Sequence, residues 1–171
     1  MEYANDATTP KGYHTIPADP ALAAKMRMAI LLADATAPNW YPILAKRVGI
    51  EEELKTMNAN LKKMEDCMAT NAKDGSPFVL GTQTPTMADI HFYAVASRPY
   101  FAKGSALHEE IGKNYNWEVL PRLVKLIEAI NARPEFKDVL SHVGTHHDYF
   151  VVQKDAEAGK RLSWWLPMKY H

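Results

Sequence analysis

The sequence predicts an all-α fold, and three observations carry that prediction. Apolar residues recur at steps of three and four in several long segments, which is the spacing of one face of an α-helix. Helix-capping residues or prolines stand where those segments begin, and proline or glycine stands near where they end. No alternation of apolar and polar residues continues for more than a few positions, so no long strand is expected.

Length and composition fit one ordinary globular domain. The chain has 171 residues, of which 47% are hydrophobic and 23% are charged. Lys and Arg total 20, as do Asp and Glu, so the formal net charge is zero. Binding to nucleic acid through phosphates requires a clustered basic excess, so we expect no nucleic-acid partner. No apolar run approaches the roughly 20 residues that cross a bilayer, so no transmembrane segment is expected.

The cysteine count and the first residues bear on location. Cys67 is the single cysteine, which excludes an internal disulfide and fits a reducing compartment. The first 20 residues carry three acidic side chains, one Lys and no apolar core, so neither a signal peptide nor a transit peptide is predicted. We expect a cytoplasmic protein; the alternative is an organelle reached by another route, as a subunit of a large complex.

The first two helices follow a proline-rich arm. Residues 1–19 are predicted to be extended, and Asp19 with Pro20 then offers an N-cap and a first helical position. The helix continues to about residue 35, with an inward face of Leu22, Met26, Ala29, Ile30 and Ala33. Pro38 and Pro42 are expected to kink or interrupt this helix. Residues 50–71 form the clearest helix, with an inward face of Leu54, Met57, Leu61, Met64 and Met68.

The stretch LGTQTPTMADIHFY, residues 80–93, begins a third helix. Thr86 is a suitable N-cap, and Asp89 at position N3 can accept from the Thr86 amide, as in a capping box. The residues that follow are apolar on almost every side, which predicts a central helix packed all round and ended by Pro99. Since the amides at such a helix start would be buried, we expect its own side chains to cap it.

Two more helices are predicted after a connecting segment. The first has an inward face of Leu120, Leu123, Val124, Ile127 and Ile130. Pro134 then opens a shorter helix over Phe136, Val139 and Leu140.

Together, FVLGTQTPTMADIHFYA and WEVLPRLVKLIEAINARPEFKDVL resemble the C-terminal helical domain of the cytosolic glutathione-transferase superfamily. The resemblance covers about residues 20 to 142. It implies a thioredoxin-like domain, which in the family supplies the catalytic residue and holds glutathione, ahead of this one. Only about 20 residues precede the first helix, so we expect that half to be absent. The predicted organisation is an arm at 1–19, a helical domain at 20–145 and a tail at 146–171.

No catalytic residue, cofactor or metal site is expected. Asp89 is interpreted as a helix cap and Cys67 as a small buried hydrophobe rather than a reactive thiol. A zinc site at His142, His146 and His147 is an alternative, but Gly144 argues against the continuous helix that it needs. Trp40 and Tyr41 either line an apolar cleft, as the resemblance implies for the first helix, or pack at a helix kink.

The tail carries the clearest interaction signal, because protein interfaces are enriched in Trp, Tyr and Met. Its candidate partner-binding residues are Trp164, Trp165, Leu166, Met168 and Tyr170; alternatively, the tail folds back on its own domain. The sequence therefore predicts a non-catalytic accessory or scaffold subunit that contacts other subunits of a large assembly. Similar stand-alone domains of the superfamily serve in translation-elongation and aminoacyl-tRNA synthetase complexes. The alternatives are a glutathione-transferase-related enzyme or an apolar-ligand carrier, working with a separate thioredoxin-like partner.

Overall fold

The computed structural model describes residues 14–37, 51–73, 75–101 and 115–134. These ranges hold four α-helices, one short 3-10 helix and no strand, which confirms the all-α prediction. In chain order the elements are α2 (Pro20–Thr36), α4 (Glu51–Asn71), α5 (Met87–Phe101), η3 (Trp117–Val119) and α7 (Pro121–Asn131). Within the same ranges, no helix is both long enough and apolar enough to cross a membrane.

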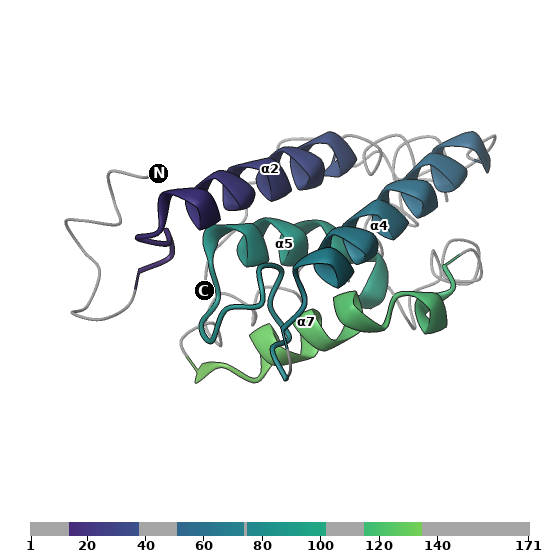
Figure 1. Ribbon diagram of the computed structural model, residues 1–171. Helices are drawn as coiled ribbons and strands as arrows, with labels where there is room; N and C mark the ends of the chain where they lie inside the picture. The colour runs from purple at the N-terminus through teal and green to yellow at the C-terminus, as the bar shows by residue number, and fades with distance from the viewer. Residues whose placement is uncertain (1–13, 38–50, 74, 102–114, 135–171) are drawn as a thin grey trace, which may run out of the picture.

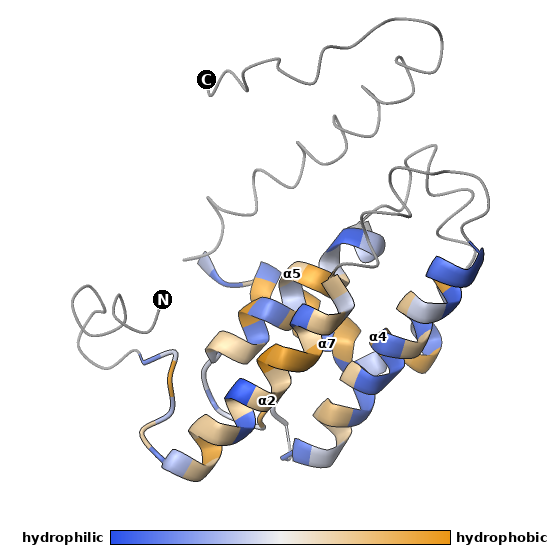
Figure 2. Ribbon diagram, turned by 90° about the horizontal axis from the view of Figure 1, so that it is seen from above, coloured by the Kyte–Doolittle hydropathy of each residue, from blue (hydrophilic) through white to orange (hydrophobic). Residues whose placement is uncertain are grey.

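The four α-helices enclose one core. α5 lies between α2 and α7, and α2 and α7 each pack against both α4 and α5 (Figure 1). Apolar residues gather where the helices meet, while the outer side of α4 is mostly hydrophilic (Figure 2). The largest fully buried side chains come from every helix and from the loop before α5: Met26, Met57, Leu61, Met64, Leu80, Phe92, Leu123, Leu126, Ile127 and Ile130.

α2 begins as its sequence predicts. The Asp19 carboxylate accepts a hydrogen bond from Ala21 N at 3.0 Å, and Pro20 occupies the first helical position. The buried face is built mainly from small residues: Ala23, Met26, Ala29, Ala33 and Thr36. Leu22 and Ile30, which the spacing had also placed inward, are half-buried at the edges of that face.

α4 buries the five residues predicted for its inward face, from Leu54 to Met68. It also buries Glu65, whose role is described below. Three acidic residues, Glu51 to Glu53, lie in the first turn, where the helix dipole favours negative charge.

α5 differs from its prediction in two ways. Ala94 is exposed and Ile90 and Tyr93 are half-buried, so the helix is not packed on every side. The sequence of α5 has apolar residues on almost every side, which predicted packing all round. In the described part of the chain, however, only α2 and α7 pack extensively against α5, on two of its sides. The helix also continues through Pro99 to Phe101 rather than ending at the proline.

α7 buries Leu123, Ile127 and Ile130 as predicted, but Leu126 is buried in place of Val124. The spacing allowed either residue beside Leu123 and Ile127, and the position of α4 and α5 decides between them. Leu120 is buried just before the helix begins. The shorter helix predicted from Pro134 onward lies almost entirely outside the described residues.

Candidate functional site

Asp89 organises the start of α5. Its side chain is completely buried, and one carboxylate oxygen, Oδ2, accepts from Thr86 N at 2.6 Å and from the Thr86 hydroxyl at 2.7 Å. The other oxygen, Oδ1, accepts from Val79 N at 2.7 Å. The first bond is the return bond of a capping box. The third ties the loop before α5 to the helix, so the carboxylate fixes a loop and a helix start together.

The arm completes this cap. Met87 N, at the first position of α5, donates to the backbone oxygen of Thr15 at 2.9 Å. The helix start is therefore satisfied partly by a segment 72 positions earlier rather than by its own side chains alone, which corrects the expectation from sequence. Ile16 packs against the core beside this contact.

Burial raises the pKa of Asp89 above the usual range of an aspartic acid, although the bonds from Thr86 and Val79 act in the opposite direction. A buried carboxyl group with a raised pKa is a common property of catalytic acids. Here both oxygens accept bonds from groups of the same helix start and its loop. The arrangement is that of a structural cap.

A second buried carboxylate caps α7 from a different helix. Glu65 of α4 accepts from Arg122 N at 3.0 and 3.1 Å and from Leu123 N at 2.9 Å. Leu120 at the N-cap has no capping side chain, and Pro121 has no amide hydrogen, so Glu65 supplies what this helix start lacks. Sequence reasoning missed this role. Its signal was an acidic residue next to Met64 and one turn after Leu61, on the buried face of α4.

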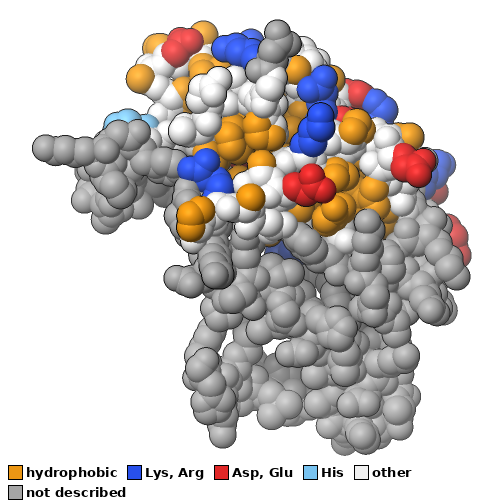
Figure 3. Space-filling model, turned by 90° about the horizontal axis from the view of Figure 1, so that it is seen from below, with side chains coloured by type: hydrophobic (Ala, Val, Ile, Leu, Met, Phe, Trp, Pro, Cys, Tyr) orange, Lys and Arg blue, Asp and Glu red, His pale blue; other side chains and the backbone are white. Residues whose placement is uncertain are grey.

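A groove of about 510 Å³ opens between the end of α4, the loop that follows it, and α7. Met68, Phe78 and Ala129 contribute apolar lining; its charged residues are Lys73, Arg122, Lys125 and Glu128. Seen from below, Lys and Arg side chains border apolar ones on this side of the molecule (Figure 3). With three cations and one anion, the lining favours acidic over basic ligands.

Cys67 is half-buried on α4 and touches the core. Burial raises the pKa of its thiol, and the amide of Asn71, 3.8 Å from the sulfur, offsets this only in part. A raised pKa keeps the sulfur protonated near neutral pH, where a thiol is a poor nucleophile.

An aromatic cluster joins the end of α5 to η3. The rings of Tyr100 and Trp117 meet edge to face at 5.2 Å, and Tyr115 lies 6.0 Å from Trp117. The Tyr115 hydroxyl and Trp117 Nε1 are buried, and no described residue accepts from them. Burial raises the pKa of Tyr115, so its hydroxyl stays neutral. Tyr115 comes directly after residues that lie outside the described ranges. We therefore assign no ligand to this cluster.

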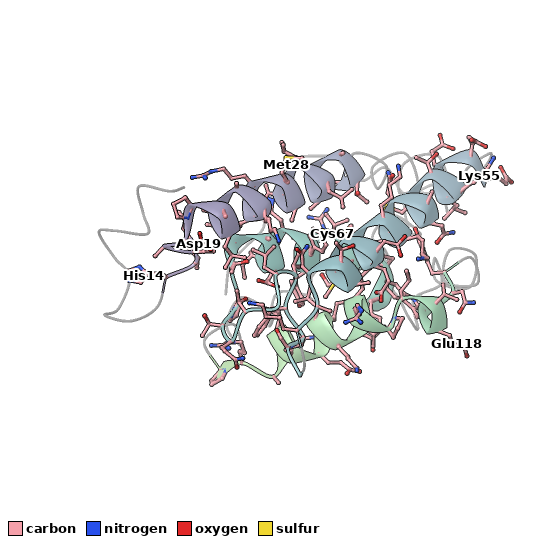
Figure 4. The ribbon with its side chains drawn as sticks, in the orientation of Figure 1. His14, Asp19, Met28, Lys55, Cys67 and Glu118 are labelled. Atoms are coloured by element: carbon pink, nitrogen blue, oxygen red, sulfur yellow. The ribbon has the colours of Figure 1, made fainter. Side chains whose placement is uncertain are left out.

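The exposed side of α2 carries a line of apolar residues, bordered by the exposed charged residues Lys25, Arg27 and Asp34. The apolar side chains recur at steps of three and four: Ala21, Ala24, Met28, Leu31 and Ala35, here called the α2 stripe. Met28 is 68% exposed and Leu31 is 62% exposed, and these are the two most exposed large hydrophobic residues in the described ranges. Met28 points away from the other helices (Figure 4). Sequence reasoning considered only the opposite, inward face.

The other residues singled out from the sequence lie outside the described residues. These are the cleft candidates Trp40 and Tyr41, the histidines His142, His146 and His147, and the tail residues Trp164, Trp165, Leu166, Met168 and Tyr170. Within the described ranges, no group of three or more His, Cys, Asp or Glu side chains is arranged to hold a metal ion.

The fold defines an all-α domain with a capped central helix. Comparison with known proteins identifies the family to which this domain belongs. The chain belongs to the family described as glutathione S-transferase, C-terminal domain, whose model matches residues 32–142. Among solved structures, it is similar to TDR1 of Leishmania, described as a unique trimeric glutathione transferase, with a TM-score of 0.73 and 18% sequence identity. That match covers 92% of this chain and 34% of the other, so this chain spans about a third of its length. No curated protein matches the chain.

Proposed function

We propose that this protein is a non-catalytic accessory subunit of a larger protein assembly, which uses its glutathione-transferase C-terminal-like domain and its aromatic tail for protein contacts. The observation that carries the proposal is the α2 stripe. Exposed apolar residues scattered singly are ordinary, but apolar residues that recur along one line of a helix are typical of a contact surface. Met28 and Leu31 lie one turn apart on that line, both more than 60% exposed.

The buried carboxylates support a structural rather than a catalytic domain. Asp89 and Glu65 are the two acidic residues buried in the described ranges, and each accepts hydrogen bonds from backbone amides at a helix start. A general acid or base must instead be able to reach a substrate. The raised pKa of Cys67 likewise argues against a nucleophilic role for its thiol.

Assembly also agrees with the structural comparison, since the similar glutathione transferase of Leishmania is described as trimeric. The composition of the tail agrees as well, because Trp164 and Trp165 are of the residue type most enriched among interface hot spots.

A pull-down from native extract tests the proposal with four proteins: the intact chain, a chain without residues 146–171, Met28→Glu/Leu31→Glu, and Val119→Glu. Val119 is a matched control, since it is a large apolar residue 53% exposed on η3, away from α2. We expect the intact chain and Val119→Glu to retain the same partner proteins. The tail deletion or the α2 double variant should lose them. Retention of all partners by both altered chains would contradict the proposal.

Family membership favours a second candidate: a glutathione-transferase-related enzyme, or a carrier of an apolar ligand, that works with a separate thioredoxin-like chain. Retention on glutathione-agarose separates the two, because the enzyme requires it when that partner is added and the accessory subunit does not. Conjugation of glutathione above the uncatalysed rate, lost on changing a residue of this chain, would favour the enzyme. A small molecule seen bound to the purified protein by native mass spectrometry would favour the carrier.

A further inference from the structure

The groove between the end of α4, the loop that follows it and α7 combines apolar and positively charged surface. Met68 and Phe78, which line it, are buried and Ala129 is half-buried, whereas Lys73 and Lys125 are exposed. Its volume of about 510 Å³ lies in the range of ligand-binding sites in proteins. The groove therefore suits a ligand that has both apolar and charged groups.

The three cations that line the groove are unpaired. Neither Lys73, Arg122 nor Lys125 forms an ion pair with another residue of the described part of the chain. Glu128, the one anion among the described lining residues, forms none either, although it lies one turn after Lys125. With three cations and one anion, the described lining carries a net charge of +2, whereas the whole chain has a formal net charge of zero. A local excess of this kind attracts an anionic ligand.

The groove follows α7 for about two turns. Arg122, Lys125 and Ala129 line it at steps of three and four, so they share one side of the helix. The seven residues from Arg122 to Ala129 rise about 10 Å along α7, which is the length of about three residues of extended chain. A short extended peptide therefore spans this part of the groove.

The polar side chains of the lining favour a peptide over a compact polar metabolite. Sites for small molecules place a few polar groups precisely against the ligand. In the described lining the one uncharged polar side chain is Ser76, and its hydroxyl already donates to Thr82 O at 2.7 Å and accepts from Phe78 N at 3.2 Å. Lys73 and Lys125 have long, flexible side chains, which attract negative charge without fixing a geometry. A flexible acidic peptide needs only this attraction and an apolar contact.

We propose that this groove binds an acidic peptide segment of a partner protein. The carboxylates of the peptide lie against the three cations, and an apolar side chain lies against Met68, Phe78 and Ala129. The inference goes beyond the proposed function, because the groove shares no residue with the α2 stripe or with the tail. So small a contact predicts weak binding, with a dissociation constant on the order of 100 µM at low ionic strength.

Fluorescence anisotropy of the full chain with a synthetic peptide tests the inference. The probe is a fluorescein-labelled peptide in which two glutamates stand on each side of one phenylalanine. We expect saturable binding that weakens about tenfold between low ionic strength and about 0.15 M, because exposed charges are then screened. Peptides with glutamine for every glutamate, or with serine for phenylalanine, should each bind at least about fivefold more weakly, since each lacks one of the two kinds of contact.

Charge variants test the site. Arg122→Gln/Lys125→Gln should weaken binding of the glutamate peptide about tenfold, whereas Glu128→Gln should tighten it about twofold, because the first removes attraction and the second removes repulsion. The matched control is Lys25→Gln/Lys55→Gln, which removes two exposed cations on α2 and at the start of α4, away from the groove. It should leave the dissociation constant unchanged.

The groove variants should fold as the wild type does. Arg122 donates to Glu65 through its backbone N, which Arg122→Gln retains. A cation in the first turn of α7 is also disfavoured by the helix dipole, so its removal should not destabilise the helix. Thermal unfolding of each variant checks this, and amide chemical shifts locate the peptide. Gly75, Ser76 and Ala129 should shift on titration, whereas the amides of α2 should not.

A competitor separates the peptide from a small amphipathic anion. Octanoate, which has one carboxylate on an apolar chain, should displace the peptide only at concentrations at least about tenfold above the dissociation constant of the peptide. Displacement at lower concentrations would make a small anion the occupant and overturn the inference. No saturable binding, equal loss in the groove and control variants, or amide shifts confined to other parts of the chain would also overturn it. The pull-down that tests the proposed function alters α2 and the tail, so either proposal can fail while the other stands.

Discussion

Asp89 accepts three hydrogen bonds at the start of α5, whereas the Thr86 hydroxyl makes one of them. Asp89→Ala should therefore destabilise the protein by about 3 kcal/mol, because it leaves two buried backbone amides without acceptors. Thr86→Ala should cost only about 1 kcal/mol, since the bond from Thr86 N to Asp89 remains. Urea unfolding of both variants measures the difference. Equal midpoints for the two would contradict the assignment of Asp89 as the organising residue.

The raised pKa of Asp89 makes a second prediction, about pH. An aspartic acid in an unfolded chain has a pKa of about 3.9, and burial raises it in the folded state. Above pH 4 and up to the raised value, the folded state therefore holds more protons than the unfolded state, and stability falls as pH rises. This contribution is fully present below about pH 4 and is lost as pH rises through the raised pKa.

Comparison with Asp89→Asn isolates the pH-dependent contribution of Asp89 to stability, because the asparagine side chain does not titrate. The free energy of unfolding of the wild type, minus that of Asp89→Asn, should decrease as pH rises from about 4 and then level off. Urea titrations at a series of pH values give this difference. A difference that grows with pH would mean that the three hydrogen bonds, rather than burial, dominate the pKa.

At the scale of elements, the start of α7 depends on Glu65 of α4. Glu65→Ala should cost about 2–3 kcal/mol, because Arg122 N and Leu123 N lose a charged acceptor in a buried place. Glu65→Gln keeps one acceptor oxygen and should cost less. Asp66→Ala, on the adjacent exposed position of α4, is the control. Hydrogen exchange should accelerate at the amides of Arg122 and Leu123 in Glu65→Ala, and unchanged exchange there would contradict the cap.

The loop between α4 and α5 turns at two glycines that differ in their surroundings. Both have positive φ, +76° at Gly75 and +64° at Gly81, but a Cβ on Gly81 would lie 2.6 Å from Asn71 O, whereas one on Gly75 would meet nothing within 4 Å. Gly75→Ala should therefore cost only the backbone strain, about 1–2 kcal/mol, and Gly81→Ala roughly twice as much. Thermal unfolding of the pair checks the order, which equal losses would contradict.

Regular elements could be predicted from the sequence, whereas contacts between elements could not. The spacing of Leu54 to Met68 specified the buried face of α4, and Asp19 with Pro20 specified where α2 begins, because these signals are local. The acceptor for Met87 N is Thr15, and the acceptor for Arg122 N is Glu65. Both bonds join segments more than 50 positions apart, and no local pattern encodes such pairing. The spacing of the α2 stripe is visible in the sequence. That its residues are exposed follows only from the structure, in which the opposite face of α2 packs against the core.

At the scale of the whole molecule, polar contacts connect three of the four α-helix pairs that pack together in the described residues. Asp34 of α2 meets His91 of α5 at 3.0 Å, and the Tyr93 hydroxyl of α5 donates to Asn131 of α7 at 2.8 Å. Glu65 provides the connection between α4 and α7. Apolar faces alone would tolerate sliding and exchange of helices, whereas the buried amide of Leu123 finds its acceptor, Glu65, only when α4 and α7 are correctly placed. This buried contact therefore helps to specify how α4 and α7 pack together.

The hydrogen bond between Thr15 of the arm and Met87 of α5 joins the residues farthest apart in the sequence among these contacts. Truncation of the arm measures its contribution to stability. A chain that begins at residue 14 keeps the acceptor Thr15 and the packed side chain of Ile16, whereas a chain that begins at residue 19 keeps neither but retains the Asp19 cap of α2. The shorter chain loses the acceptor for Met87 N and the partial burial of an isoleucine, so it should be less stable by about 2 kcal/mol. Because residues 1–13 are missing from both, their contribution cancels. Urea midpoints report the difference, and hydrogen exchange at Met87 should rise in the shorter chain alone. Equal stability and equal exchange would mean that the start of α5 does not depend on the arm.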